Sequence, residues 1–530
     1  MGWYGLSDSE HEIMKYIWKH EEVTLREVVA WLENRGYTWK ELLFEKSKIG
    51  SDDAINRYNN SLDNWERTKG YNIVEKEELV SIASYYDTTI NILNYLLQLN
   101  HETSLNRKKE NERFLTESGI NFDDDNKRVA LKYIFVNSNA MLIYGAAGTG
   151  KTTLIKYISN MFADARKLYL TKTHTALQNV KRYLDNKSNN CDFEIIDSIT
   201  RSNLSVNYDI IFVDECSTID NRTMALLLGK ISREVLLVMS GDIYQIESID
   251  FGNWFFYAKD IVKTKGASVE LGHTWRTDKE ELKSLWTAVR EKSSIITEKL
   301  SMDGPFSENL GENIFHLDDD EVVLCLNYDG KFGLNNINQY FQNANTNSKA
   351  FYWEEWTYKI GDKIIFTNTK RSVLLYNNLK GTITNISYGE KKIVFEIEIK
   401  TFYTESQCET ESFKYLRTTE NGTVIEIEII SWDDELTEER KIMTVFPFQL
   451  AYAISIHKAQ GLEYKSVKIV IPSNNAEKIT HSIFYTAITR AKEKLKIFWS
   501  AETMKSIIES FTSNDIEQVT LPIIKKDLQQ

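Results

Sequence analysis

The sequence predicts an α/β protein built on parallel sheets, with an additional all-β part and a helical N-terminal part. Three observations predict this fold class. The run Met141–Leu154 has the pattern of a short apolar strand, a glycine-rich loop and the start of a helix. Short apolar runs alternate with helical segments from about residue 121, which is typical of strands buried on both faces of a parallel sheet. After about residue 345, β-branched runs separated by turns indicate a small antiparallel sheet or barrel.

The size and composition indicate a multidomain globular protein. Its 530 residues are too many for one hydrophobic core, so we expect three or four domains. The four scattered cysteines form no C-x-x-C pair, which argues against a zinc site or disulfide framework and suits the cytoplasm. We expect no membrane span, because no apolar run approaches about 18 residues, and no signal peptide, because Asp8, Glu10 and Glu12 follow the N-terminus at once. The net charge of −13 argues against a surface that coats duplex DNA, but allows a local positive groove.

Residues 1–115 are expected to form a helical accessory domain. Apolar residues recur at helical spacing near the N-terminus, and a second helical stretch covers Glu77–Leu99. The segment from Leu6 to Val28 is similar to the start of penicillinase-repressor winged helices. The segment Trp39–Lys48, which would be the recognition helix, matches poorly. A winged helix therefore remains the alternative to a plain helical domain.

The expected strands fall into two groups, which together predict the order of the domains. The strands of parallel sheets are Met141–Tyr144, Leu168–Thr171, Ile210–Val213, Val235–Met239, Glu321–Leu326, Val467–Ile471 and Lys494–Trp499. The strands of the all-β part are Lys363–Thr367, Gly381–Ile386, Ile393–Ile399 and Thr423–Ile429. Because strand–helix alternation returns after the second group, the all-β part is expected to interrupt a second α/β domain.

The glycine-rich loop has the spacing of a phosphate-binding loop. Gly145, Gly150, Lys151 and Thr152 fit the pattern G-x-x-x-x-G-K-[ST]. Glycines let the backbone N–H groups point toward a phosphate chain, and the following helix adds the positive end of its dipole. Lys151 can reach the β- and γ-phosphates, and the Thr152 hydroxyl can hold Mg²⁺. The expected nucleotide-binding residues here are Gly145, Ala146, Ala147, Gly148, Thr149, Gly150, Lys151, Thr152 and Thr153.

Two further strands end in polar residues that suit phosphate chemistry. The run Ile210–Val213 is followed by Asp214, which can hold Mg²⁺, and by Glu215, which can accept a proton from the attacking water. A solvated acidic turn would be equally plausible for this run alone, but its distance from the phosphate loop favours catalysis. Gln245, shortly after the strand Val235–Met239, can hydrogen-bond the γ-phosphate or the attacking water.

The order of these segments over residues 120–500 resembles the superfamily 1 helicases and, within them, the RecD-like branch. The matching segments, motifs I to VI in order, are Gly145–Thr152, Thr171–Leu177 with Ile196–Ile199, Asp214–Glu215, Gly241–Gln245, Glu270–Arg276, Ser455–Glu463 and Tyr485–Lys492. The last two segments are the most diagnostic, because a generic P-loop ATPase has neither.

This resemblance implies two RecA-like parallel-sheet P-loop domains with ATP and Mg²⁺ in the cleft between them. Arg276 and Arg490 would act as arginine fingers, whereas each alone could equally form a surface salt bridge. Asn126 stands where the family usually has a glutamine that reads adenine, which leaves the preference for ATP open. Glu463, at the end of motif V, is included among the nucleotide contacts. The expected catalytic residues are Lys151, Glu215, Gln245, Arg276 and Arg490.

The resemblance also implies a groove for single-stranded DNA, with RNA left open. Its expected contacts are Thr173 and His174 of motif Ia and His457 and Lys458 of motif V, which suit phosphate oxygens. Trp254 could stack on a base. An aromatic core segment is the competing interpretation for its neighbours Phe255 and Phe256.

The all-β part resembles the SH3-like insertion of RecD-like helicases at Gly361–Ile364 and Asn377–Gly381. Residues 401–440 carry 11 acidic and 3 basic side chains by our count, so they are expected to face solvent or a protein partner and not DNA. The expected domains are residues 1–115 (accessory), 116–270 (first RecA-like), 271–345 and 447–515 (second RecA-like), 346–446 (insertion) and 516–530 (tail).

The resulting functional hypothesis is an ATP-dependent helicase or translocase that moves 5′ to 3′ on single-stranded DNA. A nucleotide-driven switch that remodels a protein partner in a repair or phage-defence complex is the alternative, and that partner would bind the N-terminal domain or the 401–440 arm. A transcription regulator is a third hypothesis, which depends only on the N-terminal similarity.

Overall fold

The computed structural model describes residues 43–45, 52–122, 124–184, 190–202, 207–248, 250–318, 320–346, 348–367, 371–372, 374–432, 437–511 and 516–529. The contacts divide the chain into two compact units. The first comprises Met1–Lys172, Val180–Trp275 and Asn514–Gln530, and the second Thr173–Asn179 and Arg276–Ser513. The winged-helix similarity at Leu6–Val28 lies outside the described residues, as does most of Trp39–Lys48.

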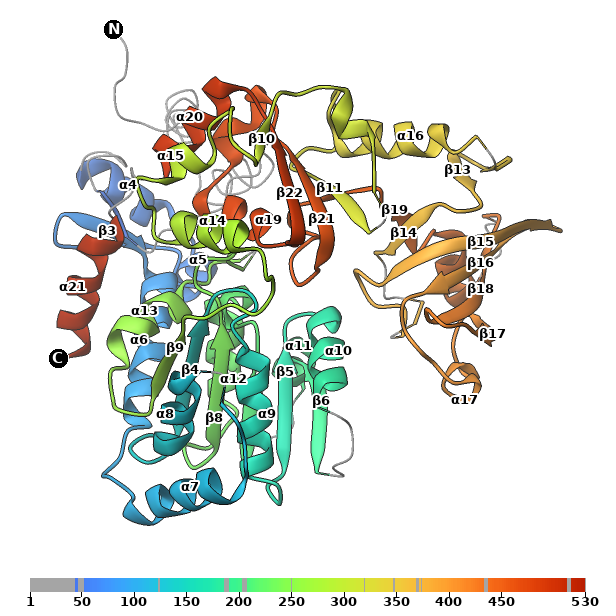
Figure 1. Ribbon diagram of the computed structural model, residues 1–530. Helices are drawn as coiled ribbons and strands as arrows, with labels where there is room; N and C mark the ends of the chain where they lie inside the picture. The colour runs from blue at the N-terminus through green and yellow to red at the C-terminus, as the bar shows by residue number, and fades with distance from the viewer. Residues whose placement is uncertain are drawn as a thin grey trace, which may run out of the picture. The chain divides into compact units, whose positions relative to one another are not determined.

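The first unit contains a six-stranded sheet in the order β6-β5-β7-β8-β4-β9, with every neighbouring pair parallel (Figure 1). Its strands are β4 (Ala140–Gly145), β5 (Lys167–Thr171), β6 (Cys191–Ile195), β7 (Ile210–Val213), β8 (Leu236–Gly241) and β9 (Ser268–Leu271). Every residue of β4, β5 and β7 is buried, and for this reason these strands could be predicted from their apolar runs in the sequence. The edge strands β6 and β9 were not predicted, because polar residues interrupt them.

Helices cover both faces of this sheet, and alternate residues of β4 separate the two cores. Met141 and Ile143 pack with α8 (Asp125–Tyr133) and α9 (Lys151–Met161). Leu142 and Tyr144 pack with the other face, where α12 (Asn221–Leu228) and α13 (Trp254–Ile261) lie. The remaining helices of this unit are α7 (Leu105–Glu117), α11 (Ile196–Arg201) and the 3₁₀ turn η1 (Cys216–Thr218), whereas the first part of α10 (His174–Tyr183) belongs to the second unit. This double cover confirms the parallel α/β prediction.

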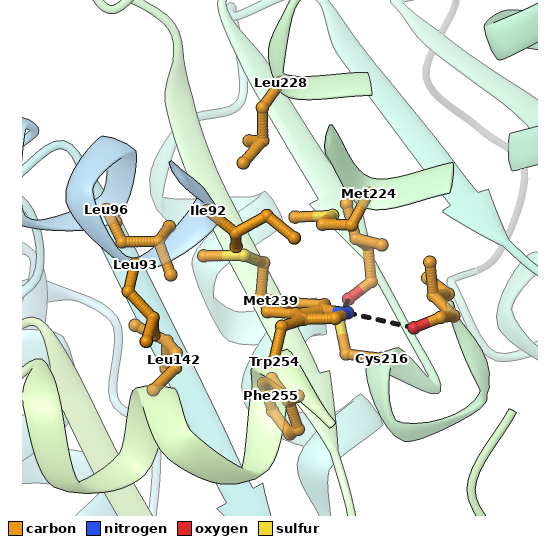
Figure 2. Packing of buried hydrophobic residues seen from close by; sticks show 14 of the residues in the cluster. Ile92, Leu93, Leu96, Leu142, Cys216, Met224, Leu228, Met239, Trp254 and Phe255 are labelled. Carbon is orange, nitrogen blue, oxygen red and sulfur yellow. Dashed lines mark hydrogen bonds between the residues drawn. The ribbon is translucent and has the colours of Figure 1, made fainter. Parts of the chain in front are cut away.

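The N-terminal part is not purely helical, which corrects the prediction for residues 1–115. A three-stranded sheet, β1 (Phe44–Glu45), β3 (Leu79–Ile82) and β2 (Ile73–Lys76), accompanies α4 (Asp52–Ser61), α5 (Asn64–Thr68) and α6 (Ala83–Gln98). The predicted helical stretch Glu77–Leu99 therefore begins with a turn and a strand; Glu77 has a positive φ of 59°. Helix α6 buries Ile92, Leu93 and Leu96 in the core of the first unit (Figure 2).

The predicted C-terminal tail contains helix α21 (Ile516–Leu528), which packs on the same unit. Its residues Ile523 and Ile524 belong to the core that includes α6. The Asp527 carboxylate accepts hydrogen bonds from Lys76 Nζ at 2.6 Å and from Tyr86 Oη at 3.0 Å. Apolar burial and these polar contacts together attach the helix to the N-terminal part of the chain.

The second unit contains a five-stranded parallel sheet in the order β10-β22-β21-β11-β20. The strands are β10 (Ser307–Glu308), β11 (Glu321–Cys325), β20 (Ala453–Ser455), β21 (Tyr464–Val470) and β22 (Ala491–Phe498). The helices of this part are α14 (Glu280–Arg290), α15 (Ile296–Lys299), α16 (Leu334–Ala344), α19 (His481–Ile488) and α20 (Ala501–Ser510), with 3₁₀ turns η2 (Glu312–Phe315) and η4 (Ser473–Lys478). The short strands β10 and β20 were not predicted.

An antiparallel sheet interrupts this α/β part of the chain, as the β-branched runs predicted. Its order is β17-β18-β16-β15-β14-β19. The strands are β14 (Lys363–Phe366), β15 (Lys380–Gly389), β16 (Lys392–Ile399), β17 (Lys414–Thr418), β18 (Thr423–Ile430) and β19 (Phe448–Leu450). A hairpin of β12 (Ala350–Trp353) and β13 (Trp356–Lys359), the short helices α17 (Glu405–Cys408) and α18 (Glu438–Lys441), and the 3₁₀ turn η3 (Ile442–Thr444) complete it. An all-β insertion is therefore confirmed, and its SH3-like character remains an interpretation.

Within the residues that the structure describes, no helix is long and apolar enough to span a membrane.

Candidate nucleotide-binding site

The phosphate loop adopts a backbone that depends on its glycines. Gly148 and Gly150 have φ angles of 76° and 84°, in the left-handed region that glycine favours. A Cβ on Gly145 would lie 2.4 Å from Thr149 Oγ1, so this position also excludes a side chain. Gly150 is the N-cap of α9 and provides no side-chain acceptor for the first N–H groups of the helix. These groups can therefore donate to an anion.

Lys151 lies over the loop that it follows. Its Nζ donates hydrogen bonds to the carbonyl oxygens of Gly145 at 2.8 Å and Ala146 at 3.2 Å. Thr152 and Thr153 occupy the first turn of α9 and are partly buried. The Thr153 hydroxyl is 2.8 Å from Tyr183 Oη, so Lys151 and Thr152 are the side chains of this turn that remain candidates for contacts with a nucleoside polyphosphate.

The segment after β9 forms two hydrogen bonds to the phosphate loop that the sequence did not predict. Thr274 Oγ1 donates to the Ala147 carbonyl at 2.8 Å, and the Trp275 backbone N–H donates to the Gly148 carbonyl at 2.8 Å. These contacts arise because β9 pairs with β4, the strand that leads into the loop. No local pattern predicts such a contact, although both residues lie within the segment assigned to motif IV.

The two predicted carboxylates lie at the end of β7. Asp214 Oδ1 accepts hydrogen bonds from Ser240 Oγ and from the Glu215 backbone N–H, the latter at 3.0 Å. Glu215 has a φ of 56°, a strained conformation for a residue with a side chain. Burial, together with the charge of Glu215, raises the pKa of Asp214 to about 6, and Lys151 partly opposes this shift.

Gln245 is held by a carboxylate to which the sequence analysis assigned no role. Its Nε2 donates to Asp242 Oδ2 at 3.1 Å, and both side chains are buried. Burial raises the pKa of Asp242, and the charge of Lys151 partly lowers it again. In the structure Gln245 is therefore oriented by Asp242, which follows the end of β8. Asp242 lies within the segment Gly241–Gln245 that resembles motif III, whereas no sequence pattern indicated Ser240 at this edge of the sheet.

The oxygen donors at this edge fit Mg²⁺ bound together with phosphates. Asp214 and the Thr152 hydroxyl are the hard oxygen ligands that Mg²⁺ prefers, and a divalent cation would relieve the repulsion between Asp214 and Glu215. Among the described residues, no group of three or more His, Cys, Asp or Glu side chains could hold a metal ion by itself.

We expect Asp214→Asn to stabilise the nucleotide-free protein at pH 7–8 by ~1–2 kcal/mol, allowing for the partial exposure of the carboxyl. The pKa of Asp214 is raised in the folded state from 3.8 to about 6, so ionisation of this group opposes folding. The penalty is absent below about pH 4, grows between about pH 4 and 6, and is complete above about pH 6. Denaturant unfolding of both proteins across this range measures it. A lower stability of the variant at pH 8 would contradict this interpretation.

The second unit gathers the residues of motifs IV, V and VI around Glu463. The Glu463 carboxylate forms ion pairs with Arg276 at 2.6 Å and Lys492 at 2.5 Å, and Arg276 Nη1 donates to the Thr489 carbonyl at 2.9 Å. Burial alone would raise the pKa of Glu463, but the charges of Arg276, Lys492 and Arg490 outweigh it and lower the pKa. Arg276 Nε is buried and has no hydrogen-bond partner.

Arg490 is almost fully buried, with an exposed fraction of 1 %. Its Nε donates to the Thr486 carbonyl at 2.8 Å and its Nη1 to the Leu462 carbonyl at 3.2 Å. The alternative interpretation of Arg490 as part of an exposed surface salt bridge is therefore wrong. Its role as an arginine finger stays a prediction.

The structure contradicts the prediction that Trp254 stacks on a base. Trp254 is fully buried between Met224, Met239 and Phe255, and its Nε1–H donates to the Ile219 carbonyl at 2.9 Å (Figure 2). The residue starts α13, and this helix turns its aromatic side chains toward the sheet. The aromatic-core interpretation, considered only for its neighbours, applies to Trp254 itself.

The other predicted ligand contacts stay predictions. Thr173 and His457 are exposed, and His174 is partly buried at the start of α10. Lys458 Nζ donates to Gln449 Oε1 at 2.8 Å. Asn126 is exposed, and its Nδ2 donates to the Glu270 carbonyl at 3.3 Å.

Two segments of the chain match the models of two protein families. Residues 124–304 match the AAA domain, and residues 450–497 match the UvrD-like helicase C-terminal domain. The first match contains the phosphate loop and the residues at the ends of β7 and β8. The second contains the whole of the segments assigned to motifs V and VI.

Three relatives illustrate the similarity along the chain. The RecBCD enzyme subunit RecD of Buchnera aphidicola (subsp. Acyrthosiphon pisum) is 21 % identical over 92 % of this chain and 88 % of its own length. An uncharacterized protein of Methanocaldococcus jannaschii is 24 % identical over 90 % of this chain, which spans only 46 % of that protein. The ATP-dependent DNA helicase Pif1 of Campylobacter jejuni is 31 % identical over 27 % of this chain and 30 % of its own length.

A crystal structure of Bacteroides Pif1 bound to single-stranded DNA aligns with a TM-score of 0.46 and 14 % identity, covering 77 % of this chain and 98 % of that one. The family matches and the relatives show that the chain is similar to superfamily 1 helicases. Within this superfamily, the similarity to RecD proteins extends over most of the chain.

Proposed function

We propose that the protein is an ATP-dependent DNA helicase or translocase that moves 5′ to 3′ along single-stranded DNA. The observation that carries the proposal is the edge of the first sheet, where the phosphate loop, Lys151, Asp214 and Glu215 gather. The charge of Lys151 influences the pKa values of both Asp214 and Asp242, so this ammonium and these carboxylates interact electrostatically. This is the residue set that phosphoryl transfer to water requires.

In this proposal each residue has a defined task. The loop N–H groups and Lys151 bind the phosphates, and Glu215 accepts a proton from the attacking water. Gln245, oriented by Asp242, hydrogen-bonds the γ-phosphate or that water. Bound Mg²⁺ would supply charge neutralisation at the β- and γ-phosphates. Arg276 and Arg490 would stabilise charge in the transition state, and Glu463 would contact the nucleotide.

The DNA contacts and the domain boundaries are part of the same proposal. Single-stranded DNA would contact Thr173, His174, His457 and Lys458 through its phosphates. The residue ranges given above for the two RecA-like domains and the insertion describe our proposed functional division. The strands of the insertion place Glu396 directly opposite Glu426, which supports the interpretation that its acidic segment does not bind DNA.

The decisive experiment is ATP hydrolysis measured with and without single-stranded DNA and single-stranded RNA of equal length. We expect DNA to raise kcat at least about tenfold, because DNA that favours the hydrolytically competent state shifts the population toward it. Glu215→Gln, purified in the same way, is the control for contaminating ATPases. Hydrolysis that no nucleic acid stimulates would contradict the proposal and favour the nucleotide-driven switch. Unwinding of duplexes with a 5′ or a 3′ tail then tests the polarity.

A further inference from the structure

A lysine at the end of β5 bridges two carboxylates that come from different elements of the first unit. Lys172 Nζ lies 3.0 Å from Asp197 Oδ1, in α11, and 3.3 Å from Asp220 Oδ2, at the N-cap of α12. Lys172 directly follows the last residue of β5, and Thr173, a proposed DNA contact, is next in the chain. The proposed mechanism gives no task to the lysine or to its two partners.

The bridge is partly shielded from water, so its charges interact more strongly than those of an exposed pair. The exposed fractions of the Lys172 and Asp220 side chains are 27 % and 6 %. Burial lowers the pKa of Lys172, but the hydrogen bonds and charges of Asp197 and Asp220 outweigh it and raise the pKa. Burial likewise raises the pKa of Asp220, but its bonds to Thr223 and the charge of Lys172 lower it overall. Both shifts favour the charged forms, so Lys172 and Asp220 attract each other as ions at neutral pH.

A short, internally bonded segment connects Asp220 to Glu215, the proposed base. The backbone N–H and the hydroxyl of Thr218 both donate to the Glu215 carbonyl, at 2.9 Å and 2.7 Å. Asp220 accepts from the backbone N–H of Thr223 at 2.7 Å and so caps α12. Because Glu215 has a φ of 56°, its conformation depends on the structure around it. A shift of Asp220 therefore affects the turn η1 and the residue that precedes this turn.

Direct contact between Lys172 and a DNA phosphate is the competing interpretation. To make this contact, the ammonium would have to leave a carboxylate that is almost buried, and the loss of the partner of a buried charge is costly. The two aspartates beside it would also repel a phosphate. The geometry therefore favours a role in holding the two carboxylates.

We propose that Lys172 is a positioning residue that links the DNA-contacting segment after β5 to the turn that follows Glu215. The inference rests on the proposed function. DNA bound at Thr173 and His174 would restrain the end of β5, and the bridge to Asp220 extends this restraint to η1. Because the link transmits the effect of DNA, its loss lowers the DNA-stimulated kcat. Hydrolysis without DNA and the KM for ATP stay nearly unchanged.

The test measures ATP hydrolysis against the concentration of single-stranded DNA, which gives the basal kcat, the stimulated kcat and the DNA concentration for half-maximal stimulation. We expect Lys172→Met to lower the stimulated kcat about tenfold, with the basal kcat and the KM for ATP within about twofold of the wild type. Lys172→Arg should keep most of the stimulation, because a guanidinium can contact two carboxylates at once. Lys263→Met, which removes an exposed lysine paired with Asp260 at 3.0 Å, is the control and should behave like the wild type.

Asp220→Ser tests the other side of the bridge. Serine caps a helix about as well as aspartate, but it is shorter and carries no charge that could hold Lys172. We expect this variant to lose the stimulation to the same extent as Lys172→Met. The double variant should lose no more than either single variant, since both changes break the same link.

Thermal unfolding shows which variants are folded. Wild-type stimulation in folded Lys172→Met and Asp220→Ser would overturn the inference, as would an equal loss of basal and stimulated kcat, which indicates a merely structural bridge. A higher half-maximal DNA concentration with a full stimulated kcat would also overturn it, because Lys172 would then contact phosphate directly. Wild-type protein that no DNA stimulates would instead contradict the proposed function, so the two failures are distinguishable.

Discussion

Lys151→Ala is expected to reduce ATP turnover by at least about 10²–10³-fold. Lys151 is the one lysine of the loop itself, and its Nζ lies 2.8 Å from the Gly145 carbonyl at the point where the phosphate chain would bind. Loss of this ammonium leaves the charge that develops on the γ-phosphate without its nearest cationic partner in the loop. Steady-state hydrolysis with saturating single-stranded DNA measures the effect.

Lys156→Ala is the matched control for this variant, because Lys156 lies on the same helix and donates to the Tyr183 carbonyl at 3.2 Å. It should retain wild-type turnover. Both variants should fold, since neither side chain belongs to the hydrophobic cores of the described part of the first unit. Normal turnover by folded Lys151→Ala protein would refute the assignment of the phosphate loop.

Arg490→Lys is expected to lower the DNA-stimulated kcat by about 10³-fold, with a much smaller change in ATP affinity. An arginine finger interacts mainly with charge that appears in the transition state, so its loss affects kcat more than ground-state binding. Lysine keeps the positive charge but loses the planar group that can contact two oxygens at once. Pre-steady-state nucleotide binding and stimulated hydrolysis, measured on the same preparation, separate the two effects.

Lysine is preferable to alanine here because Arg490 is buried and donates to the Thr486 and Leu462 carbonyls. Alanine would leave buried acceptors without partners and reduce stability for reasons unrelated to catalysis. Arg417→Lys, an exposed residue that pairs with Glu396 at 3.3 Å, is the control. Arg276→Lys tests whether the second arginine compensates. Weakened ATP binding with an intact stimulated kcat would make Arg490 a ground-state contact.

The sequence by itself determined the parallel α/β architecture and much of the nucleotide site. Strands β4, β5 and β7 are buried on both faces, so their residues had to be continuously apolar and were readable without a structure. The phosphate loop was readable because its backbone needs glycine at Gly148 and Gly150. Asp214 and Glu215 were readable because they directly follow such a strand.

Other features depended on contacts between segments that are distant in the sequence. Trp254 has an aromatic neighbourhood that suits a base platform or a core equally well, and only the packing of α13 against the sheet decided for the core. The strands β2 and β3 escaped prediction within a segment of helical periodicity, because four-residue strands carry too few positions to establish an alternation.

The residues that support the site were decided by tertiary structure alone. Thr274 reaches the Ala147 carbonyl because β9 pairs with β4, and Asp242 orients Gln245 at the end of β8. A local sequence pattern indicates which backbone conformation a residue favours and whether its neighbours are buried. The pattern does not indicate which side chain from a distant segment packs against that residue, because this contact depends on how the helices and strands pack.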